Sequence, residues 1–313
     1  MKSKEIKIIF MGTPSISAYV LEEMIKEGYN IIGVISQPDR PQGRKHIISA
    51  TPTKEVANRY NIPCYQKEKI RLDYEFLKEI KPDLILTLAY GQILPQGLLD
   101  IPSLGCLNLH GSLLPKYRGA APIQYALINN EKETGMSLME MTAQMDAGRV
   151  YAVNKFPILE EDNASSLFSK MAISAYTLVK ESLEDYVNGK LEGTPQDESL
   201  VTFAPTIKKE EEHLDLSKSV KTIYGYIRAL SEAPGAYLNS PVGKFKIYKA
   251  KIHSYEVKGQ VGMIITCDNK NGLLLQCIDG ILELEVVQKE GKSKIDAKSF
   301  INGNKDFLGT ILF

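Results

Sequence analysis

Asn108 and His110 lie where a predicted strand ends, and their side chains are suited to the chemistry of a developing oxyanion. Residues 105–109 form an apolar run that Asn108 interrupts, and His110, Gly111 and Ser112 follow where the chain must turn. Open α/β sheets bind ligands at the carboxyl ends of their strands. A carboxamide offers N–H donors, and an imidazole donates or exchanges a proton near neutral pH. Together these two side chains suit a reaction centre.

Each of these residues also has an ordinary structural interpretation when it is taken alone. A buried histidine is often a hydrogen-bonded core residue, and an asparagine at a strand end often caps a turn. Here the pair is followed directly by Ser-Leu-Leu-Pro-Lys-Tyr-Arg-Gly, residues 112–119. The combination favours a reaction centre over two unrelated structural residues.

The composition limits the classes of protein to which the chain can belong. Its 313 residues, 43% hydrophobic and 24% charged, allow two domains and are typical of soluble globular proteins. The 38 basic and 38 acidic residues balance, so nucleic-acid binding would need a local patch. The four cysteines form no CxxC pair, which argues against a zinc site or a disulfide framework. No long apolar span or signal sequence is visible, so we expect a cytoplasmic protein without a membrane anchor.

The first residues predict a βαβ unit and hence a parallel sheet. An apolar strand at 6–11 is followed by a helix at 15–26, with apolar residues at helical spacing, and by a second strand at 31–35. The intervening Gly-Thr-Pro turn, residues 12–14, has one glycine where a dinucleotide loop needs three, and it has no phosphate-loop lysine. We therefore expect a tight turn there and no nucleotide site.

Residues 38–46, Pro-Asp-Arg-Pro-Gln-Gly-Arg-Lys-His, form a segment rich in basic residues and in residues that break regular structure. The whole connection, 37–51, is long for a loop between a strand and a helix, and such loops are often functional. Two interpretations remain open from the residues alone: a solvated surface loop, or a basic finger that touches phosphates.

The remaining pattern predicts a larger α/β domain, a linker and a smaller β domain. In the first half we expect helices at 52–60, 72–80 and 164–186 and strands at 62–65, 84–88, 135–141 and 149–156. Residues 188–198 are polar and rich in turn formers, which is typical of a linker. A helix at 220–230 and short strands at 245–253, 261–267, 272–277 and 281–288 then suggest a small barrel or sandwich.

Several motifs, in order, resemble the formyltransferases that use 10-formyltetrahydrofolate, and most closely those that act on methionyl-tRNA. They are Phe-Met-Gly-Thr-Pro at 10–14, Gln-Pro-Asp-Arg-Pro-x-Gly-Arg at 37–44, Asn-Leu-His-Gly-Ser-Leu-Leu-Pro-x-Tyr-Arg-Gly-x-Ala-Pro at 108–122 and Asp-Ala-Gly at 146–148. Further likeness lies at 203–207, 227–230, 234–237 and 300–304. The resemblance covers nearly the whole chain.

This resemblance implies a fold and a domain division. The fold would be α/β, with a Rossmann-like, mostly parallel sheet in a formyltransferase catalytic domain (1–188). A linker (189–206) would lead to a C-terminal domain (207–313) that is an OB-like β-barrel and binds tRNA. We expect a monomer.

The same resemblance implies a reaction and a set of site residues. The formyl group of 10-formyltetrahydrofolate would move to the α-amino group of methionyl-initiator tRNA, giving N-formylmethionyl-tRNA for translation initiation, with no metal. Asn108 and a protonated His110 would stabilise the oxyanion, and Asp146 would favour the imidazolium and relay the amine proton. The folate co-substrate would be held by Ser112, Leu113, Leu114, Pro115, Leu88, Tyr90 and Gly91. The acceptor stem of the tRNA would be met by Arg40, Arg44 and Lys45.

Two features keep a second function open. The chain continues after Lys45 with His-Ile-Ile, where the family commonly has further basic residues, and fewer charges predict a weaker salt dependence of tRNA binding. Arg149 also stands where relatives often have an acidic residue. The alternative is a formyltransferase that acts on an amino-sugar nucleotide or another small amine.

Overall fold

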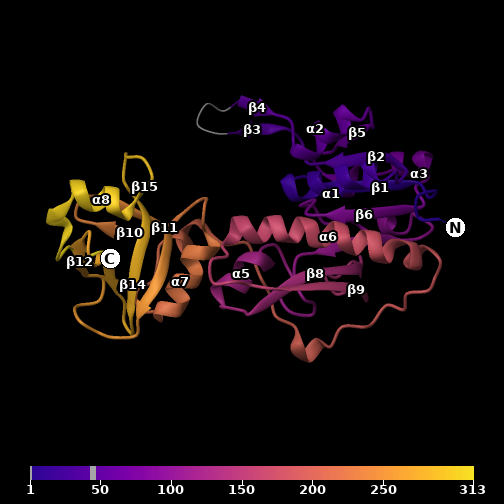
Figure 1. The fold of residues 1–313 in the computed structure, drawn as a ribbon. Coiled ribbons are helices and arrows are strands. Elements are labelled where there is room, and N and C mark those ends of the chain that lie inside the picture. Colours follow the sequence, from indigo (N-terminus) through magenta and orange to yellow (C-terminus); the bar gives the residue numbers. More distant parts are fainter. Residues whose placement is uncertain (1, 43–46) are drawn as a thin grey trace. The chain divides into compact units, whose positions relative to one another are not determined.

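The computed structural model describes residues 2–42 and 47–313 and divides them into two units, which are described separately below (Figure 1). The first unit comprises the described residues up to Gly119, together with Thr134–Phe156 and Phe168–Phe203. The second comprises Ala120–Glu133, Pro157–Leu167 and Ala204–Phe313. These units interleave along the chain, whereas the predicted domain boundaries are linear, and those boundaries stay a prediction.

A seven-stranded sheet with the order β5-β2-β1-β6-β7-β8-β9 forms the centre of the first unit. β1 pairs in parallel with β2 and β6, β5 with β2 and β7 with β6, whereas β8 runs antiparallel to β7. The strands are β1 (Ile8–Gly12), β2 (Ile31–Ser36), β5 (Cys64–Gln66), β6 (Leu84–Leu88), β7 (Cys106–His110), β8 (Glu133–Glu140) and β9 (Val150–Pro157). The carboxyl ends of five parallel strands therefore share one edge.

The apolar runs form the interior strands because both faces of this sheet are covered. All residues of β1 and of β6 are buried. On one face, Ile9, Met11 and Ile85 pack in a core cluster with Leu77 and Leu98 from the helical connections. The helices of this half are α1 (Ser15–Lys26), α2 (Pro52–Arg59), α3 (Phe76–Ile80), α4 (Gln96–Leu99) and most of α6 (Ala164–Val187), with a 3₁₀ turn η1 (Ile70–Leu72).

Two expectations for this half were wrong. The segment 37–51 contains a hairpin, since β3 (Arg40–Gln42) pairs antiparallel with β4 (Ile47–Ser49). Pro41 is compatible with β3 because this sheet has only two strands among the described residues. Proline has no backbone N–H, and the described part of the chain supplies no third strand to which that position would have to donate a hydrogen bond. The helix expected at 72–80 begins only at Phe76, because residues 70–72 form the separate 3₁₀ turn.

The expected linker at 188–198 is also attached to the first unit. Val150 and Thr194 exchange two backbone hydrogen bonds of 2.9 Å, so the chain returns from α6 along the start of β9. A short 3₁₀ turn, η2 (Glu198–Leu200), follows. The polar, turn-rich composition here belongs to a surface segment that is hydrogen-bonded to the first unit.

The second unit is built on an antiparallel sheet with the order β10-β11-β14-β13-β12, and β15 pairs with β14. Its elements are β10 (Ala236–Ser240), β11 (Gly243–Ser254), β12 (Ile264–Asp268), β13 (Gly272–Gln276), β14 (Ile281–Lys289), β15 (Ile295–Asp296), α5 (Pro122–Ile128), α7 (Val220–Ala229), α8 (Ala297–Gly303), η3 (Lys209–Glu212) and η4 (Lys305–Phe307). Alternate residues of these strands form one core, which includes Phe245, Ile247 and Leu284.

The last residues join the two edge strands of that sheet. Leu312 N–H donates to the Gly262 carbonyl, and Ile264 N–H donates to the Thr310 carbonyl, beside β12. Phe313 and Asn239 exchange two further bonds, of 2.7 and 3.0 Å, on β10. Hydrogen bonding therefore continues around a small barrel, which leaves no open edge between β12 and β10. The predicted fold class, a mostly parallel Rossmann-like sheet followed by an OB-like barrel, is confirmed.

Helix α7 packs tightly against α5 at Gly225. A Cβ built at Gly225 would lie 2.7 Å from the carbonyl oxygens of Leu127 and Ile128. Nearby, the buried Arg228 donates to the carbonyls of Asp162 (2.6 Å) and Leu159 (2.8 Å), which attaches the 157–167 segment to the same unit. Among the described residues, no helix is both long and apolar enough to span a bilayer.

Replacing Gly225 by alanine should therefore destabilise the protein, although alanine favours a helix by roughly 1 kcal/mol. We expect Gly225→Ala to lower the free energy of unfolding by about 1–3 kcal/mol, because backbone atoms of α5 must shift. Gly303→Ala is the matched control, since its Cβ would meet no atom within 4 Å. Thermal unfolding measures both variants. A Gly225→Ala protein as stable as the control would contradict this packing.

Candidate active site

The carboxyl end of β7 holds Asn108 and His110 between two hydrogen-bonded neighbours. Asn108 is paired with Thr87 of β6 and Met139 of β8, and His110 is paired with Ser137. The apolar residues of β7 are buried, His110 is 5% exposed, and Asn108 is partly accessible. An interior strand thus brings both polar side chains to the sheet edge at which ligands are expected.

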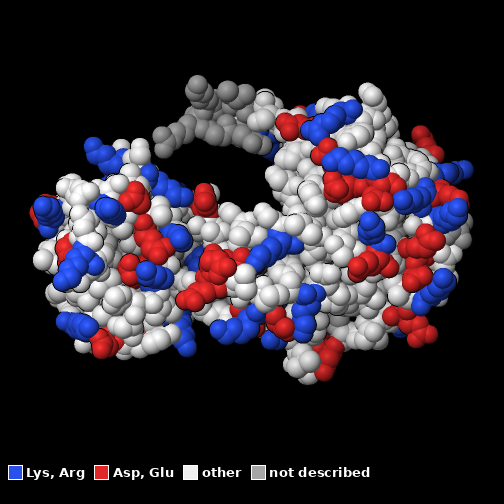
Figure 2. Space-filling model, in the orientation of Figure 1, with Lys and Arg blue, Asp and Glu red and all other residues white. Residues whose placement is uncertain are grey.

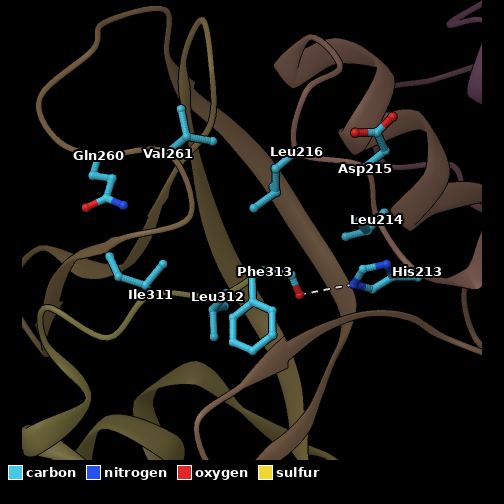
Figure 3. A pocket seen from close by; sticks show the side chains of 9 residues that line it. All are labelled: His213, Leu214, Asp215, Leu216, Gln260, Val261, Ile311, Leu312 and Phe313. Carbon is cyan, nitrogen blue, oxygen red and sulfur yellow. Dashed lines mark hydrogen bonds between the residues drawn. The ribbon is translucent and has the colours of Figure 1, made fainter.

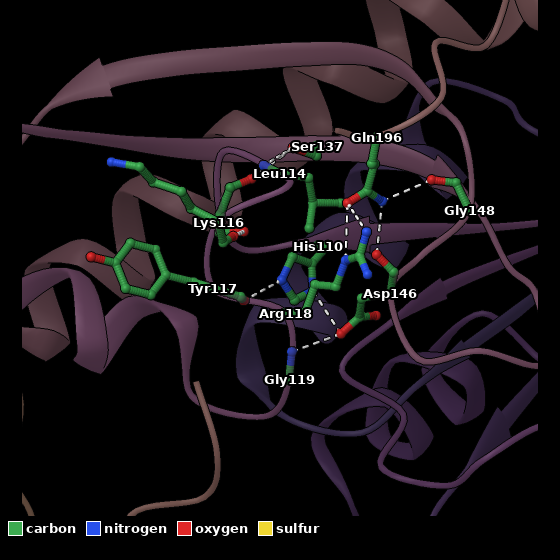
Figure 4. A network of polar contacts seen from close by, with 11 residues as sticks. His110, Leu114, Lys116, Tyr117, Arg118, Gly119, Ser137, Asp146, Gly148 and Gln196 are labelled. Carbon is green, nitrogen blue, oxygen red and sulfur yellow. Dashed lines mark hydrogen bonds and ion pairs between the residues drawn. The ribbon is translucent and has the colours of Figure 1, made fainter. Parts of the chain in front are cut away.

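The imidazole of His110 has one ring nitrogen engaged and one directed at a carboxylate (Figure 4). Nε2 lies 2.9 Å from the Tyr117 carbonyl oxygen, and because a carbonyl only accepts, Nε2 carries a hydrogen. Nδ1 lies 3.6 Å from Asp146 Oδ2. Nδ1 is therefore the ring nitrogen that can exchange a proton with a reacting group.

Asp146 reaches His110 from the loop between β8 and β9. Its backbone is left-handed, with φ of 50°, and its Oδ2 accepts a 2.9 Å hydrogen bond from Gly119 N–H. The side chain of Asp146 is 16% exposed. Residues that are separate in the sequence, 108–110, 117–119 and 146, therefore converge, which places the predicted catalytic side chains of His110 and Asp146 together.

The carboxamide of Asn108 has no hydrogen-bond partner among residues 2–42 and 47–313. Its two N–H donors are free to meet an anionic oxygen, and donors held ready at a developing charge are a major source of catalysis. The site therefore combines a free carboxamide, an imidazole and a carboxylate at one sheet edge. Such a set can stabilise an oxyanion and accept a proton from an attacking amine.

The predicted folate-contacting residues occupy two loops at this edge. Ser112 is 1% exposed, and its hydroxyl donates to the Lys116 carbonyl at 2.6 Å, so the side chain stabilises the 112–116 turn. Ser137 Oγ donates to the Ser112 carbonyl and accepts from Leu114 N–H, which attaches Leu113, Leu114 and Pro115 to β8.

The second loop follows β6, the strand beside β7. Leu88 is 3% and Tyr90 is 2% exposed, whereas Gly91 is exposed. The Tyr90 hydroxyl has no partner among the described atoms, and burial raises the pKa of Tyr90 to about 12. Tyr90 therefore stays neutral, and its side chain packs in the core beneath the loop.

Sequence reasoning missed four residues that surround the catalytic pair: Arg118, Gln196, Glu198 and Thr202. Arg118 donates to Gln196, and Gln196 donates to the loop of Asp146 (Figure 4). Arg118 is 1% exposed and also donates to Glu198. Arg118 belongs to a motif that we recognised, but its partners lie about 80 residues further along the chain in the expected linker. No local pattern links residues so far apart.

Of the residues predicted to meet tRNA, Arg40 is described and lies in β3. Arg40 is exposed and pairs with Glu68 at 2.8 Å, and Arg44 and Lys45 lie outside the described residues. At the base of the hairpin, the Lys54 ammonium beside Asp39 holds the pKa of that carboxyl below its usual range. Gln66 also donates to Asp39, so the start of the hairpin is attached to α2 and β5.

The described residues hold no group of three His, Cys, Asp or Glu side chains that could bind a metal ion. A cavity of about 460 Å³ in the C-terminal half is lined by residues such as His213, Leu216 and Phe313 and contains none of the predicted site residues (Figure 3). On the face seen in Figure 2, side chains of both charges intermingle, in keeping with the formal net charge of zero.

Known proteins resemble this chain over nearly its whole length. Methionyl-tRNA formyltransferases of Lactobacillus johnsonii and Listeria monocytogenes are each 42% identical to it, over 299 and 300 residues, and in both cases 95% of each chain is covered.

Solved structures share the fold at lower identity. An N-formyltransferase from Helicobacter canadensis has a TM-score of 0.68 at 21% identity and covers 89% of this chain and 99% of its own. HypX from Aquifex aeolicus, solved with tetrahydrofolic acid, has a TM-score of 0.64 at 20% identity and covers 96% of this chain, which spans 47% of HypX.

Family models cover both halves of the chain. Residues 5–183 match the formyl transferase family, and residues 206–305 match the C-terminal domain of formyl transferases. The sequence motifs, the sheet edge with its amide, imidazole and carboxylate, and these matches agree. The chain belongs to the formyl transferase family.

Proposed function

We propose that this protein transfers the formyl group of 10-formyltetrahydrofolate to the α-amino group of methionyl-initiator tRNA. The observation that carries the proposal is the full-length likeness to relatives named methionyl-tRNA formyltransferase, at about 42% identity over 95% of the chain. The convergence of Asn108, His110 and Asp146 supports the chemistry of acyl transfer. The catalytic domain would span 1–188 and the linker 189–206. The C-terminal tRNA-binding domain would span 207–313, in a cytoplasmic monomer.

The reaction needs an oxyanion site and a proton acceptor. The formyl donor supplies an activated carbonyl, and the neutral amine of the aminoacyl ester attacks its carbon. The carboxamide of Asn108 and Nδ1–H of His110 donate hydrogen bonds to the oxygen that becomes negative. Asp146 Oδ2 is already held by Gly119, so Oδ1 takes the proton that the amine releases. Collapse of the tetrahedral centre breaks the bond to N10 of the folate, which is protonated as it leaves.

Two loops at this edge would hold the folate. Because β6 pairs in parallel with β7, the loop that carries Leu88, Tyr90 and Gly91 begins beside Asn108. At Gly91 the backbone is exposed with φ of 88°, so its peptide groups are accessible without an intervening side chain. Ser112, Leu113, Leu114 and Pro115 form the opposite turn, held on Ser137. The pterin would bind between these two loops.

Binding of tRNA would involve the hairpin and the C-terminal domain. Arg40 lies in β3, and Arg44 and Lys45 follow in the sequence just after that strand. In the C-terminal domain, Lys244 lies 4.3 Å from the centre of the Tyr237 ring and Lys294 lies 4.7 Å from that of Tyr248. Cations next to aromatic rings are typical of surfaces that bind exposed nucleotides and phosphates.

A direct assay distinguishes this function from the alternative. The protein is supplied with 10-formyltetrahydrofolate and, in parallel, with methionyl-initiator tRNA or an amino-sugar nucleotide. We expect N-formylmethionine to be released from the tRNA after hydrolysis, and no formylated sugar. Formylation of the sugar alone would reject the tRNA function and keep the chemistry.

Removing the oxyanion donor His110 or the proton acceptor Asp146 should abolish most turnover. We expect His110→Ala and Asp146→Asn each to lower kcat by about 10²- to 10⁴-fold, the range spanned by the loss of an oxyanion donor or of a general base. Asparagine tolerates the left-handed backbone and keeps an acceptor for Gly119, so the Asp146 variant should fold normally. His253→Ala and Asp185→Asn are the controls, because both side chains are well exposed and lie far from the site residues in sequence. Near-wild-type rates for either site variant, with a normal melting temperature, would refute its role.

Removing Arg44 should affect the tRNA and not the folate. We expect Arg44→Ala to lower kcat/KM for methionyl-tRNA roughly tenfold. The slope of log K against log salt concentration should decrease by about one, as expected for the loss of one phosphate contact. The KM for 10-formyltetrahydrofolate should stay unchanged. Arg71→Ala removes an exposed arginine outside the hairpin and serves as the control. Equal losses for both substrates would indicate a structural role for the hairpin.

A further inference from the structure

The loop that carries Asp146 needs support from outside itself. Asp146 has a left-handed backbone, which costs a residue other than glycine of order 1–3 kcal/mol unless its surroundings impose it. Inside the loop, Ala147 N–H reaches the Gln144 carbonyl only at 3.4 Å. The loop also passes close to β8, since a Cβ at Gly148 would lie 2.0 Å from the Glu140 carbonyl oxygen. The position of the carboxylate therefore depends on whatever holds this backbone.

The side-chain amide of Gln196 holds the loop on both sides of the turn. Its Nε2 donates to the carbonyl oxygens of Asp146 and Gly148, each at 2.8 Å. Both hydrogens on Gln196 Nε2 are used, so this one planar amide fixes the carbonyl groups on either side of Ala147. No other side chain among the described residues donates to either carbonyl.

Arg118 determines which way this amide faces. Its Nε and Nη2 donate to Gln196 Oε1 at 3.1 and 2.9 Å. Because a guanidinium only donates, the amide oxygen must face Arg118, and the amide nitrogen must face the loop. Glu198 accepts from the same guanidinium at 2.8 Å, which compensates a charge that is 1% exposed. The orientation of Gln196 is thus fixed by a buried cation.

The same segment also supports the other catalytic group. Thr202 Oγ1 accepts from Tyr117 N–H at 2.9 Å, and the Thr202 carbonyl accepts from Arg118 N–H at 2.9 Å. Tyr117 is the residue whose carbonyl receives the hydrogen of His110 Nε2. We name residues 194–203 the strap, since this segment contacts the supports of both Asp146 and His110.

We propose that Gln196, oriented by Arg118, is a positioning residue that holds Asp146 in its left-handed conformation and so directs its carboxylate to His110 and to the attacking amine. This inference rests on the proposed formyl transfer for its kinetic consequence, but its structural consequence does not depend on any activity. Gln196 touches neither His110 nor a reacting group in this role, so it acts on the chemical step only through Asp146.

Gln196→Glu tests the proposal with the smallest change. Glutamate keeps the length and an acceptor for Arg118, but it replaces the donor group with an oxygen that faces two carbonyls. We expect kcat to fall about 10- to 100-fold, as for a misplacement of about 1 Å, with the KM for 10-formyltetrahydrofolate within twofold of the wild type. Asp197→Asn is the matched control, because Asp197 is an exposed neighbour whose side chain hydrogen-bonds to Ser199.

Hydrogen exchange supplies a measurement that is independent of turnover. The Gly119 amide donates to the Asp146 carboxylate, whereas the Arg118 amide donates to Thr202 of the strap. In Gln196→Glu we expect the Gly119 amide to exchange at least about tenfold faster, while the Arg118 amide stays protected. That pattern corresponds to a displaced Asp146 carboxylate while the strap is still in place.

A double-mutant cycle completes the test. In an Asp146→Asn background, Gln196→Glu should lower kcat little further, since the group it positions is already lost. The proposal would be overturned if the two substitutions lowered kcat independently, so that their effects multiplied. It would also be overturned if Gln196→Glu kept the wild-type kcat, or if the Gly119 amide exchanged at the wild-type rate in that variant. If the wild-type protein failed to formylate methionyl-tRNA, the proposed function would fall, and the exchange at Gly119 would still decide the role of Gln196.

Discussion

The buried guanidinium of Arg118 is the constraint on which the arrangement of the site depends. A charge that is 1% exposed must be paired and fully hydrogen-bonded, because an uncompensated buried cation destabilises a fold by several kcal/mol. Gln196 and Glu198 supply those acceptors, and both come from the strap. The strap must therefore lie against the 117–119 turn. Its position then brings Gln196 to the Asp146 loop and Thr202 to the Tyr117 peptide.

The positions of His110 and Asp146, the proposed catalytic pair, thus depend on groups that have no part in the proposed chemistry. His110 is fixed by one carbonyl, and Asp146 is fixed by one amide hydrogen and a left-handed backbone. Enzymes need such groups within a fraction of an ångström of the productive geometry, and a supporting layer of hydrogen bonds achieves this. By contrast, Asn108 has a free carboxamide on a rigid interior strand, so the sheet itself sets its position.

In the proposed reaction, the chemistry and the choice of substrate would rest on different parts of the chain. The amide, imidazole and carboxylate lie within the first unit, and nothing in them distinguishes an aminoacyl ester from another primary amine. The features that favour tRNA are the hairpin segment and the lysines beside aromatic rings in the C-terminal barrel. The charges on the visible face are otherwise mixed, so selectivity would come from these local groups and not from an overall field.

The sequence by itself determined the parallel sheet and a second domain of short strands, and it singled out Asn108 and His110 as candidates, because apolar periodicity and contiguous motifs are local properties of a chain. The choice of a barrel over a sandwich came from the resemblance. The resemblance also placed Asp146 among the candidates. Only the tertiary structure decided that β3 and β4 pair, that Asp146 faces Nδ1, and that the expected linker supports the catalytic pair. These features rest on contacts between segments far apart in the sequence, such as Arg118 with Gln196, and no local pattern encodes such a pairing.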